Sequence, residues 1–303
     1  PELPDLSGFD LHEATVRLVG RYPTTAPAEL LADARIHLDS LTNVINGAMP
    51  RGRHRQLLVD AFDTASLAAC AAKMDGHPGE ASAYRALARR LADESRIGRL
   101  RGCALLLSAV AHLPVWGDGD PLAALELLNT AAPLVGSRGL VAMEVAMLQA
   151  ESYAALPDRE RDALAAVARA QAAGVGGDEG FFSLAGAFAD HDDPHVMAGW
   201  EGFCHLLLKR TDEGLQLIDH ALDVAHLNAR TPVFLYSHVT LGHTMAGDPE
   251  PACHAAHQTL DVAEATGYHA AVHRIHIVRG RMLPEWADVQ CVRDLDERLR
   301  LAV

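Results

Sequence analysis

The hinge Gly247-Asp248-Pro249 constrains the fold more than any other feature of the chain, because it separates two stretches of helical periodicity, 231–246 and 250–266. Gly247 permits the backbone angles of a tight stop, Asp248 can accept hydrogen bonds from the free N–H groups of the next helix, and Pro249 suits its first turn. The second stretch carries one apolar stripe, formed by Ala252, Ala256, Leu260 and Ala263, and Gly267 ends it. An apolar stripe needs a partner, so the sequence predicts a pair of packed helices.

Four earlier stretches resemble this unit, which indicates a repeat. Each has a turn with Gly, Pro or Asp, followed about five residues later by an apolar residue. These apolar residues, with that of the last unit, are Ala81, Ala124, Ala163, Leu215 and Ala252. Their spacing is about 40 residues, as in tetratricopeptide and related helical repeats, with one longer interval before Leu215. We therefore predict an all-α chain, a right-handed α-solenoid of about five tetratricopeptide-like helix pairs with capping helices at both ends.

The predicted array is one continuous domain with an insertion. Its parts are N-terminal capping helices over 1–52, repeats 1–3 over 53–173, an inserted loop over 174–193, repeats 4–5 over 194–267 and C-terminal capping helices over 268–303. The insertion opens with a glycine-rich run that cannot be a stable helix, and Phe181 and Phe182 after it need burial. It is either a connector held by its aromatic rings or a lid across the groove of the solenoid.

Several local expectations accompany this array. Asp120, Asp193 and Asp248 each precede a proline, which predicts that each caps a helix. The first helix of the second repeat is expected over 97–116, and single helices near 268–282 and 285–301 are expected to close the array. Residues 47–55 are expected to be a basic turn with three arginines. That turn either contacts a nucleic acid or an attached domain, or is a solvated loop.

The charge argues against nucleic-acid binding by this chain alone. The formal net charge is −14, and the acidic residues are spread over hinges and outer faces. Such a surface repels phosphate backbones and favours a basic peptide or cationic ligand, although weakly at physiological salt.

The cysteines and the apolar runs predict a cytoplasmic protein that does not enter a membrane. The five cysteines are widely spaced among Ala and Leu, which is typical of reduced core thiols. No apolar run approaches the roughly 18 residues of a membrane span. The chain opens at Pro1 without Met, which we interpret as a piece of a longer protein.

Catalytic and metal-binding motifs are absent from the sequence. Nucleophile elbows, phosphate loops and dinucleotide fingerprints are all missing, so we expect neither an enzyme nor a cofactor. Three groups of histidines invite a metal hypothesis: His269 with His273 and His276, Cys253 with His254 and His257, and Asp190, His191 and Asp192 with His195. None has the spacing of a known metal motif, and surface or structural histidines are the simpler interpretation.

The remaining candidate site is the concave groove of the solenoid. The first helix of each pair lines that side, so projection of the repeat register indicates which polar or aromatic residues face inward. The predicted ligand-binding residues are Asp63, Ser66, Cys70, Ser108, His112, Glu144, Met147, Glu151, Trp200, Cys204 and Ser237, with Lys73 on the same face. Each of these positions can equally be explained by helix packing, because an error of one residue in register turns a side chain by about 100°.

The last repeats resemble a known family. The runs 246–253, 260–263, 266–267, 279–281 and 292–300 are similar to the C-terminal portion of actinobacterial Cro/repressor-type (XRE) helix-turn-helix transcriptional regulators, and 53–58 and the repeats after it extend the similarity. The resemblance implies a tetratricopeptide-like array that senses a ligand or partner and sets oligomeric state. It implies a peptide or small-molecule effector, a homodimer, and DNA contact only through an N-terminal domain missing from this chain. The alternative is a protein–protein interaction scaffold without a small-molecule ligand.

Overall fold

The protein is all-helical in the part of the chain that the computed structural model describes, which is residues 8–47, 50–116, 119–173, 194–224, 231–282 and 284–302. The predicted insertion at 174–193, with Phe181, Phe182 and Asp193, lies outside these residues. No strand occurs among the described residues. The α-helices are α1 (Gly8–Gly20), α2 (Pro27–Ile45), α3 (Arg51–Met74), α4 (Pro78–Ser95), α5 (Gly98–Ala109), α6 (Pro121–Val135), α7 (Leu140–Ala154), α8 (Glu160–Ala173), α9 (Pro194–Leu207), α10 (Thr211–Val224), α11 (Thr231–Ala246), α12 (Pro249–Thr266), α13 (Ala270–Arg279) and α14 (Gln290–Leu301); η1 (Val110–His112) and η4 (Pro284–Asp288) are short 3-10 helices.

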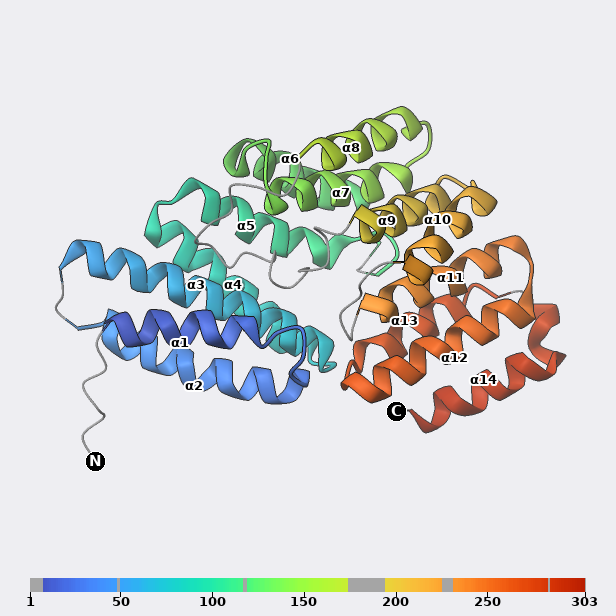
Figure 1. Cartoon of the computed structure of the whole chain (residues 1–303), viewed down its shortest axis with the longest axis horizontal. Helices are drawn as coiled ribbons and strands as arrows, with labels where there is room; N and C mark the ends of the chain where they lie inside the picture. The colour runs from blue at the N-terminus through green and yellow to red at the C-terminus, as the bar shows by residue number, and fades with distance from the viewer. Residues whose placement is uncertain are drawn as a thin grey trace.

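The helices pack against their neighbours in sequence order, as a helical repeat protein requires. The closest packing joins α3 to α4, α5 to α6, α7 to α8, α9 to α10 and α11 to α12, and each pair then contacts the next. Figure 1 shows the resulting arch, which runs from α1 and α2 at one end to α12 and α14 at the other. The predicted all-α class and the sequential, repeat-like packing are confirmed.

The expected helix boundaries hold at the last hinge and fail at three other places. Gly247 and Gly267 have φ of +91° and +68°, so both adopt the left-handed conformation that stops a helix. The Asp120 carboxylate accepts a hydrogen bond from Ala123 N at 3.0 Å, whereas Asp248 makes no such bond. Its carboxylate instead lies 3.9 Å from the ring of His243, so the prediction that Asp248 caps its helix is wrong.

Prolines explain two of the other errors. The predicted helix over 97–116 ends at Ala109 and continues as η1, and Leu113 is extended at φ −56°, ψ 142°. Pro114 disfavours helical angles at the residue before it. The expected basic turn is wrong from Arg51 onward, because α3 begins directly after the extended Pro50 and takes up the three arginines. The helix expected over 285–301 likewise divides into η4 and α14.

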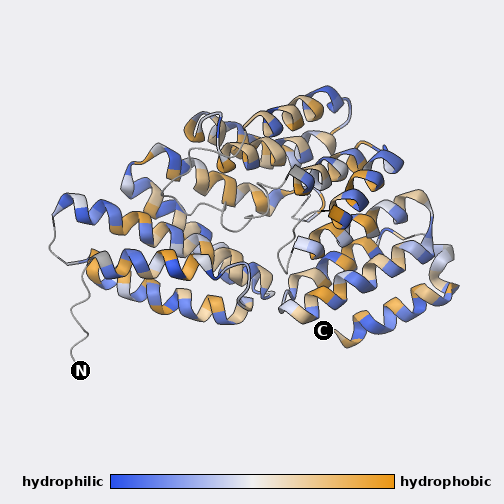
Figure 2. Ribbon diagram, viewed as in Figure 1, coloured by the Kyte–Doolittle hydropathy of each residue, from blue (hydrophilic) through white to orange (hydrophobic). Residues whose placement is uncertain are grey.

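The first and second helices of the pairs differ in burial. We call α3, α5, α7, α9, α11 and α13 the inner helices, and the others the outer helices. Every residue is buried over 57–69 of α3, 141–147 of α7 and 237–242 of α11. An outer helix such as α14 buries only one stripe, Val292, Leu295 and Leu299, and Figure 2 shows hydrophilic residues along the rest of it. The inner helices are therefore the core of the array.

The two ends of the arch meet. Helix α13 contacts α3, and a Cβ atom on Gly267 would lie 3.4 Å from Cδ of Pro27 at the start of α2. A Cβ atom on Gly76, after α3, would similarly lie 3.8 Å from Cβ of His269, before α13. The concave side therefore forms an interior bounded by both ends of the array.

None of the described helices combines the length and the apolar character that crossing a membrane requires.

Candidate ligand-binding cavity

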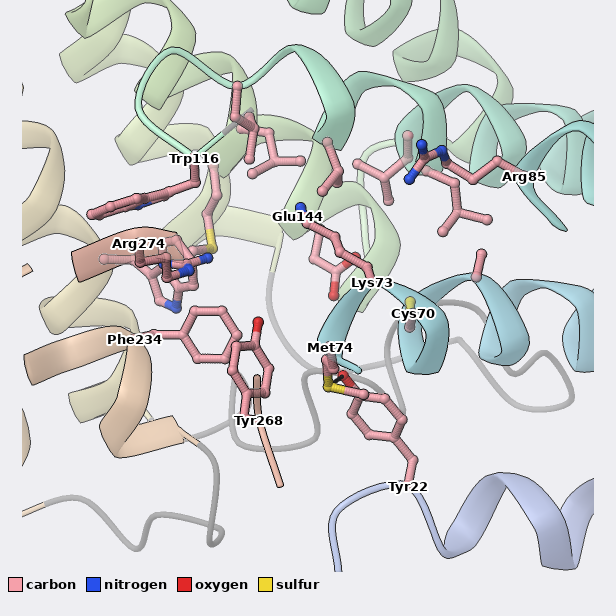
Figure 3. Close-up of a pocket in the computed structure, with 18 residues that line it drawn as sticks. Tyr22, Cys70, Lys73, Met74, Arg85, Trp116, Glu144, Phe234, Tyr268 and Arg274 are labelled. Carbon is pink, nitrogen blue, oxygen red and sulfur yellow. Dashed lines mark hydrogen bonds between the residues drawn. The ribbon is translucent and has the colours of Figure 1, made fainter. Parts of the chain in front are cut away.

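A cavity of about 90 Å³ lies in this interior and receives side chains from nearly the whole array. The inner helices α3, α5, α7, α9, α11 and α13 all contribute, and Figure 3 shows the side chains converging from opposite sides. One water needs roughly 10–15 Å³ of such space, so the cavity can hold several waters or a small molecule. Its lining is Tyr22, Ala69, Cys70, Lys73, Met74, Arg85, Leu106, Leu107, Val110, Leu113, Trp116, Glu144, Met147, Leu148, Trp200, Phe234, Tyr268 and Arg274.

The structure brings some of the predicted site residues together. Cys70, Glu144, Met147 and Trp200 line this cavity, as does Lys73. A smaller cavity of about 20 Å³ adjoins it through Met147 and Trp200, and Glu151 and Cys204 line it. The register projection thus placed residues from three separate repeats around one interior space.

The other predicted residues lie outside both linings. Ser66, Ser108 and Ser237 donate their hydroxyl hydrogen bonds to backbone carbonyls one turn earlier in their own helices. Asp63 is buried within α3, and His112 lies in η1. Short hydroxyl side chains often bond back to their own helix in this way.

Arg274 is the most confined cation of the cavity. Its guanidinium carbon lies 4.6 Å from the ring centroid of Trp116 and 4.5 Å from that of Phe234, so it stacks against both rings. Its side chain is 7% exposed, and Nη1 donates to Ser237 Oγ at 3.5 Å. Burial lowers the pKa of Arg274 from its ordinary value, but a guanidinium stays charged at neutral pH.

Lys73 and Arg85 add two cations from α3 and α4. Neither forms a hydrogen bond or salt bridge with any residue that the structure describes. Burial, reinforced by Arg274 and Arg85, lowers the pKa of Lys73 to about 8, so its amine is still mostly protonated at pH 7. Figure 3 shows Lys73 extending toward the centre of the cavity, between Arg274 on one side and Arg85 on the other.

Two buried glutamates lie on the same interior, both on α7. Burial raises the pKa of Glu144 well above its ordinary value, which favours the neutral, protonated carboxyl. Burial also raises the pKa of Glu151, to about 7, although the charges of Arg274 and Lys73 oppose the shift. Within the described residues, neither oxygen of Glu151 accepts a hydrogen bond.

An aromatic cluster supports the wall beside Arg274. The His238 ring stacks on Phe203 with centroids 3.9 Å apart, and Trp116 Nε1 donates to His238 Nε2 at 3.2 Å. Burial, and then the charge of Arg274, lowers the pKa of His238 well below its ordinary value. A neutral ring that accepts at Nε2 carries its proton on Nδ1, so this histidine fixes the indole and acts as a core residue.

The cavity cysteine is not an activated nucleophile. Burial raises the pKa of Cys70 to about 12, and burial similarly raises the pKa of Cys204 beside the smaller cavity. The thiolate is the reactive form of cysteine, and it is not populated here at neutral pH.

The candidate metal groups contain no assembled site where they can be assessed. Over the described ranges, no set of three or more His, Cys, Asp or Glu side chains is arranged to hold a metal ion. The group of Asp190, His191 and Asp192 lies outside the described residues.

Several lining residues were missed by the sequence reasoning, chiefly Arg274, Arg85, Trp116, Phe234 and Tyr268. Arg274 and Tyr268 belong to a stretch that was assigned to a capping helix, and Trp116 follows the unexpected end of α5. Arg85 reaches the interior from an outer helix. The available signal was an arginine or aromatic residue within an otherwise apolar stretch, as at Arg274.

A scan against models of protein families finds no match to this chain, and a search of curated proteins finds none either.

Proposed function

We propose that this chain is the ligand-sensing region, and a dimerisation region, of a cytoplasmic transcriptional regulator of the XRE type. In this proposal about five tetratricopeptide-like pairs form a right-handed superhelix, and the DNA-binding domain is outside the chain. The effector, a peptide or a small metabolite, binds on the concave side and has no covalent chemistry done on it. The resemblance of the last repeats supports the class of protein.

The cavity at the junction of the two ends is the observation that carries the sensing proposal. Residues from α3 and from α13, at opposite ends of the arch, line the same space. A ligand that contacts both prefers one curvature of the array over others. Coupling of roughly 1–3 kcal/mol between effector and DNA binding needs no more than such a preference. A space of about 90 Å³ suits a small metabolite better than a peptide enclosed within it.

Thermal unfolding and tryptophan emission test this proposal. Trp200 and Trp116 both line the cavity, so an effector should raise the melting temperature and change the emission. Trp200→Phe and Trp116→Phe identify which indole reports binding. If saturating screens of metabolites and peptides change neither signal, sensing is rejected and the interaction scaffold becomes the better explanation.

Dimerisation is tested separately by light scattering coupled to size exclusion. A mass of two chains across a tenfold range of concentration supports it, and a monomer at the highest concentration rejects it for this region.

A further inference from the structure

Three cations face the interior of the array, and none of them has a carboxylate partner in the part of the chain that the structure describes. Lys73, Arg85 and Arg274 come from α3, α4 and α13, and all three line the same cavity. None of them forms a salt bridge with a carboxylate among the described residues. Removing a charge from water costs several kcal/mol unless a countercharge and hydrogen bonds replace the water. Three such groups around one small space destabilise the ligand-free protein. A bound anion would offset part of this desolvation free energy.

The two nearby glutamates are weak countercharges. Burial raises the pKa of Glu144 well above its ordinary value, which favours its neutral form, and a protonated carboxyl can donate a hydrogen bond. Glu151 lines the adjoining smaller cavity and is only partly ionised near pH 7. The described lining of the main cavity therefore has three basic side chains and one carboxyl, in a chain whose formal net charge is −14.

The rest of the lining is apolar and aromatic. The rings of Trp116 and Phe234 flank Arg274, and Leu106, Leu107 and Met147 are among the remaining walls. Both rings lie against the Arg274 guanidinium, whose N–H groups bond Ser237 and Tyr268. A guanidinium has five N–H donors, so donors remain that can bond a planar carboxylate. Such a lining accepts an apolar body attached to a charged head.

We propose that the cavity binds a small organic anion, whose carboxylate lies between Lys73 and Arg274 and whose apolar or aromatic body packs against Trp116 and Phe234. This inference rests on the proposed sensing function and adds the charge and size of the effector. It departs from the cationic ligand that the net charge of the whole chain favours.

Three probes of nearly equal shape test it, namely 3-phenylpropionate, 3-phenylpropanamide and 3-phenylpropylamine, titrated into the whole chain by calorimetry at pH 7. We expect the carboxylate to bind at least about tenfold more tightly than the amide, and the amine to bind most weakly, because like charges repel. Lys73→Met and Arg274→Met should each weaken carboxylate binding by about tenfold or more.

Controls separate loss of charge from loss of folding. Arg17→Met removes a surface cation on α1 that pairs with Glu13 and is 67% exposed, so it should leave all three affinities unchanged. Amide binding should persist in Lys73→Met, which shows that the cavity is still formed. A variant that loses amide and carboxylate binding together has lost the cavity itself. The test then depends on the order in which the wild-type protein binds the three probes.

The outcomes distinguish this inference from the proposed function. If the amide or the amine binds as tightly as the carboxylate, or if the metabolite screen yields only neutral or cationic effectors, the anion inference is overturned while sensing stands. If no probe binds and the screen also gives no effector, both fail together.

Discussion

The inner and outer helices of this array differ in whether their charged side chains have partners of opposite charge. On the outside, arginines join neighbouring helices through exposed salt bridges: Arg35 of α2 with Glu80 of α4, and Arg298 of α14 with Asp261 of α12. On the inside, Lys73, Arg85 and Arg274 line a cavity, and no described carboxylate pairs with them. Water solvates the outer charges whether or not they are paired, whereas the inner charges depend on what occupies the cavity.

This difference limits what the net charge can predict about a ligand. Most of the acidic residues contribute to a solvated outer surface, where screening weakens their field within about 8–10 Å. The charges nearest a bound molecule are the few on the inner face, and those are mainly cationic. A ligand is selected by these local charges, and the total charge is a guide to solubility and long-range attraction.

The largest expected effect tests whether inner helices tolerate added volume. A Cβ atom on Gly202 of α9 would lie 2.7 Å from the carbonyl oxygen of Gly214 on α10 and 2.8 Å from Cγ1 of Ile218. Backbone cannot yield without separating the two helices, so Gly202→Ala should destabilise the protein by about 3 kcal/mol in urea unfolding.

The matched change on an outer helix should have the opposite sign. Gly79 of α4 has no atom within 4 Å of where its Cβ would be, so Gly79→Ala should stabilise by about 0.5 kcal/mol through helix propensity. Equal effects of the two substitutions would show that the inner helices are not packed more closely than the outer ones.

Lys73→Met should stabilise the ligand-free protein by about 1–3 kcal/mol at pH 7 while it weakens anion binding. The pKa of Lys73 falls from 10.5 to about 8 on folding, so at pH 7 the folded protein holds a buried cation at a cost. That cost is relieved as pH rises from about 8 to 10.5, so wild type should approach the variant in stability over this range.

Urea unfolding of both proteins between pH 7 and 10 measures this difference, with Arg17→Met as the surface control. The charged groups that act on Lys73 are Arg274, Arg85, Cys70 and Glu151. A variant less stable than wild type at every pH would mean that Lys73 has a countercharge in the ligand-free protein.

Glu151 predicts a pH dependence of the opposite direction. Its folded pKa of about 7 is above its ordinary value of 4.5, so the folded state binds the proton more tightly. The contribution of Glu151 to the free energy of unfolding is fully present below pH 4.5 and is lost as pH rises toward 7. The free energy of unfolding falls by at most about 1.4 kcal/mol per pH unit over this range.

We expect the free energy of unfolding of wild type, minus that of Glu151→Gln, to fall between pH 5 and pH 7. Taking this difference removes the contribution of the histidines, which titrate in the same range in both proteins. Arg274 and Lys73 are the charges that face Glu151. A difference that does not change with pH would show that Glu151 is ionised in the folded protein throughout.

The helices were predictable from sequence because most of their signals are local. The stripe of Ala252, Ala256 and Leu260 and the positive φ of Gly267 depend on a few neighbouring residues. The misplaced boundaries have local causes as well, because Pro50 and the residue before Pro114 are extended and interrupt the helices there. The side-chain cap expected at Asp248 does not form, and its carboxylate lies 3.9 Å from the ring of His243, five residues earlier.

The site was only partly predictable because it is made by closure of the whole array. Cys70, Glu144, Met147 and Trp200 follow from the register of single helices. Arg274 reaches the cavity because the stacking of successive helix pairs brings α13 against α3. This contact depends on the whole array, so the local sequence around Arg274 does not predict it. The charge of the interior could not be predicted either, because it depends on which carboxyls burial leaves neutral.

The smallest expected effect is on an outer ion pair. Arg35 and Glu80 join α2 to α4, and both side chains are 46% exposed. Arg35→Ala should therefore destabilise the protein by less than about 1 kcal/mol, and most of that loss should disappear at 1 M NaCl, because salt screens exposed pairs. At the same salt concentration, only an anion that enters the cavity can reduce the stabilising effect of Lys73→Met. Loss of that effect in 1 M NaCl but not in 0.5 M Na₂SO₄ would show that chloride, but not the larger sulfate, reaches Lys73.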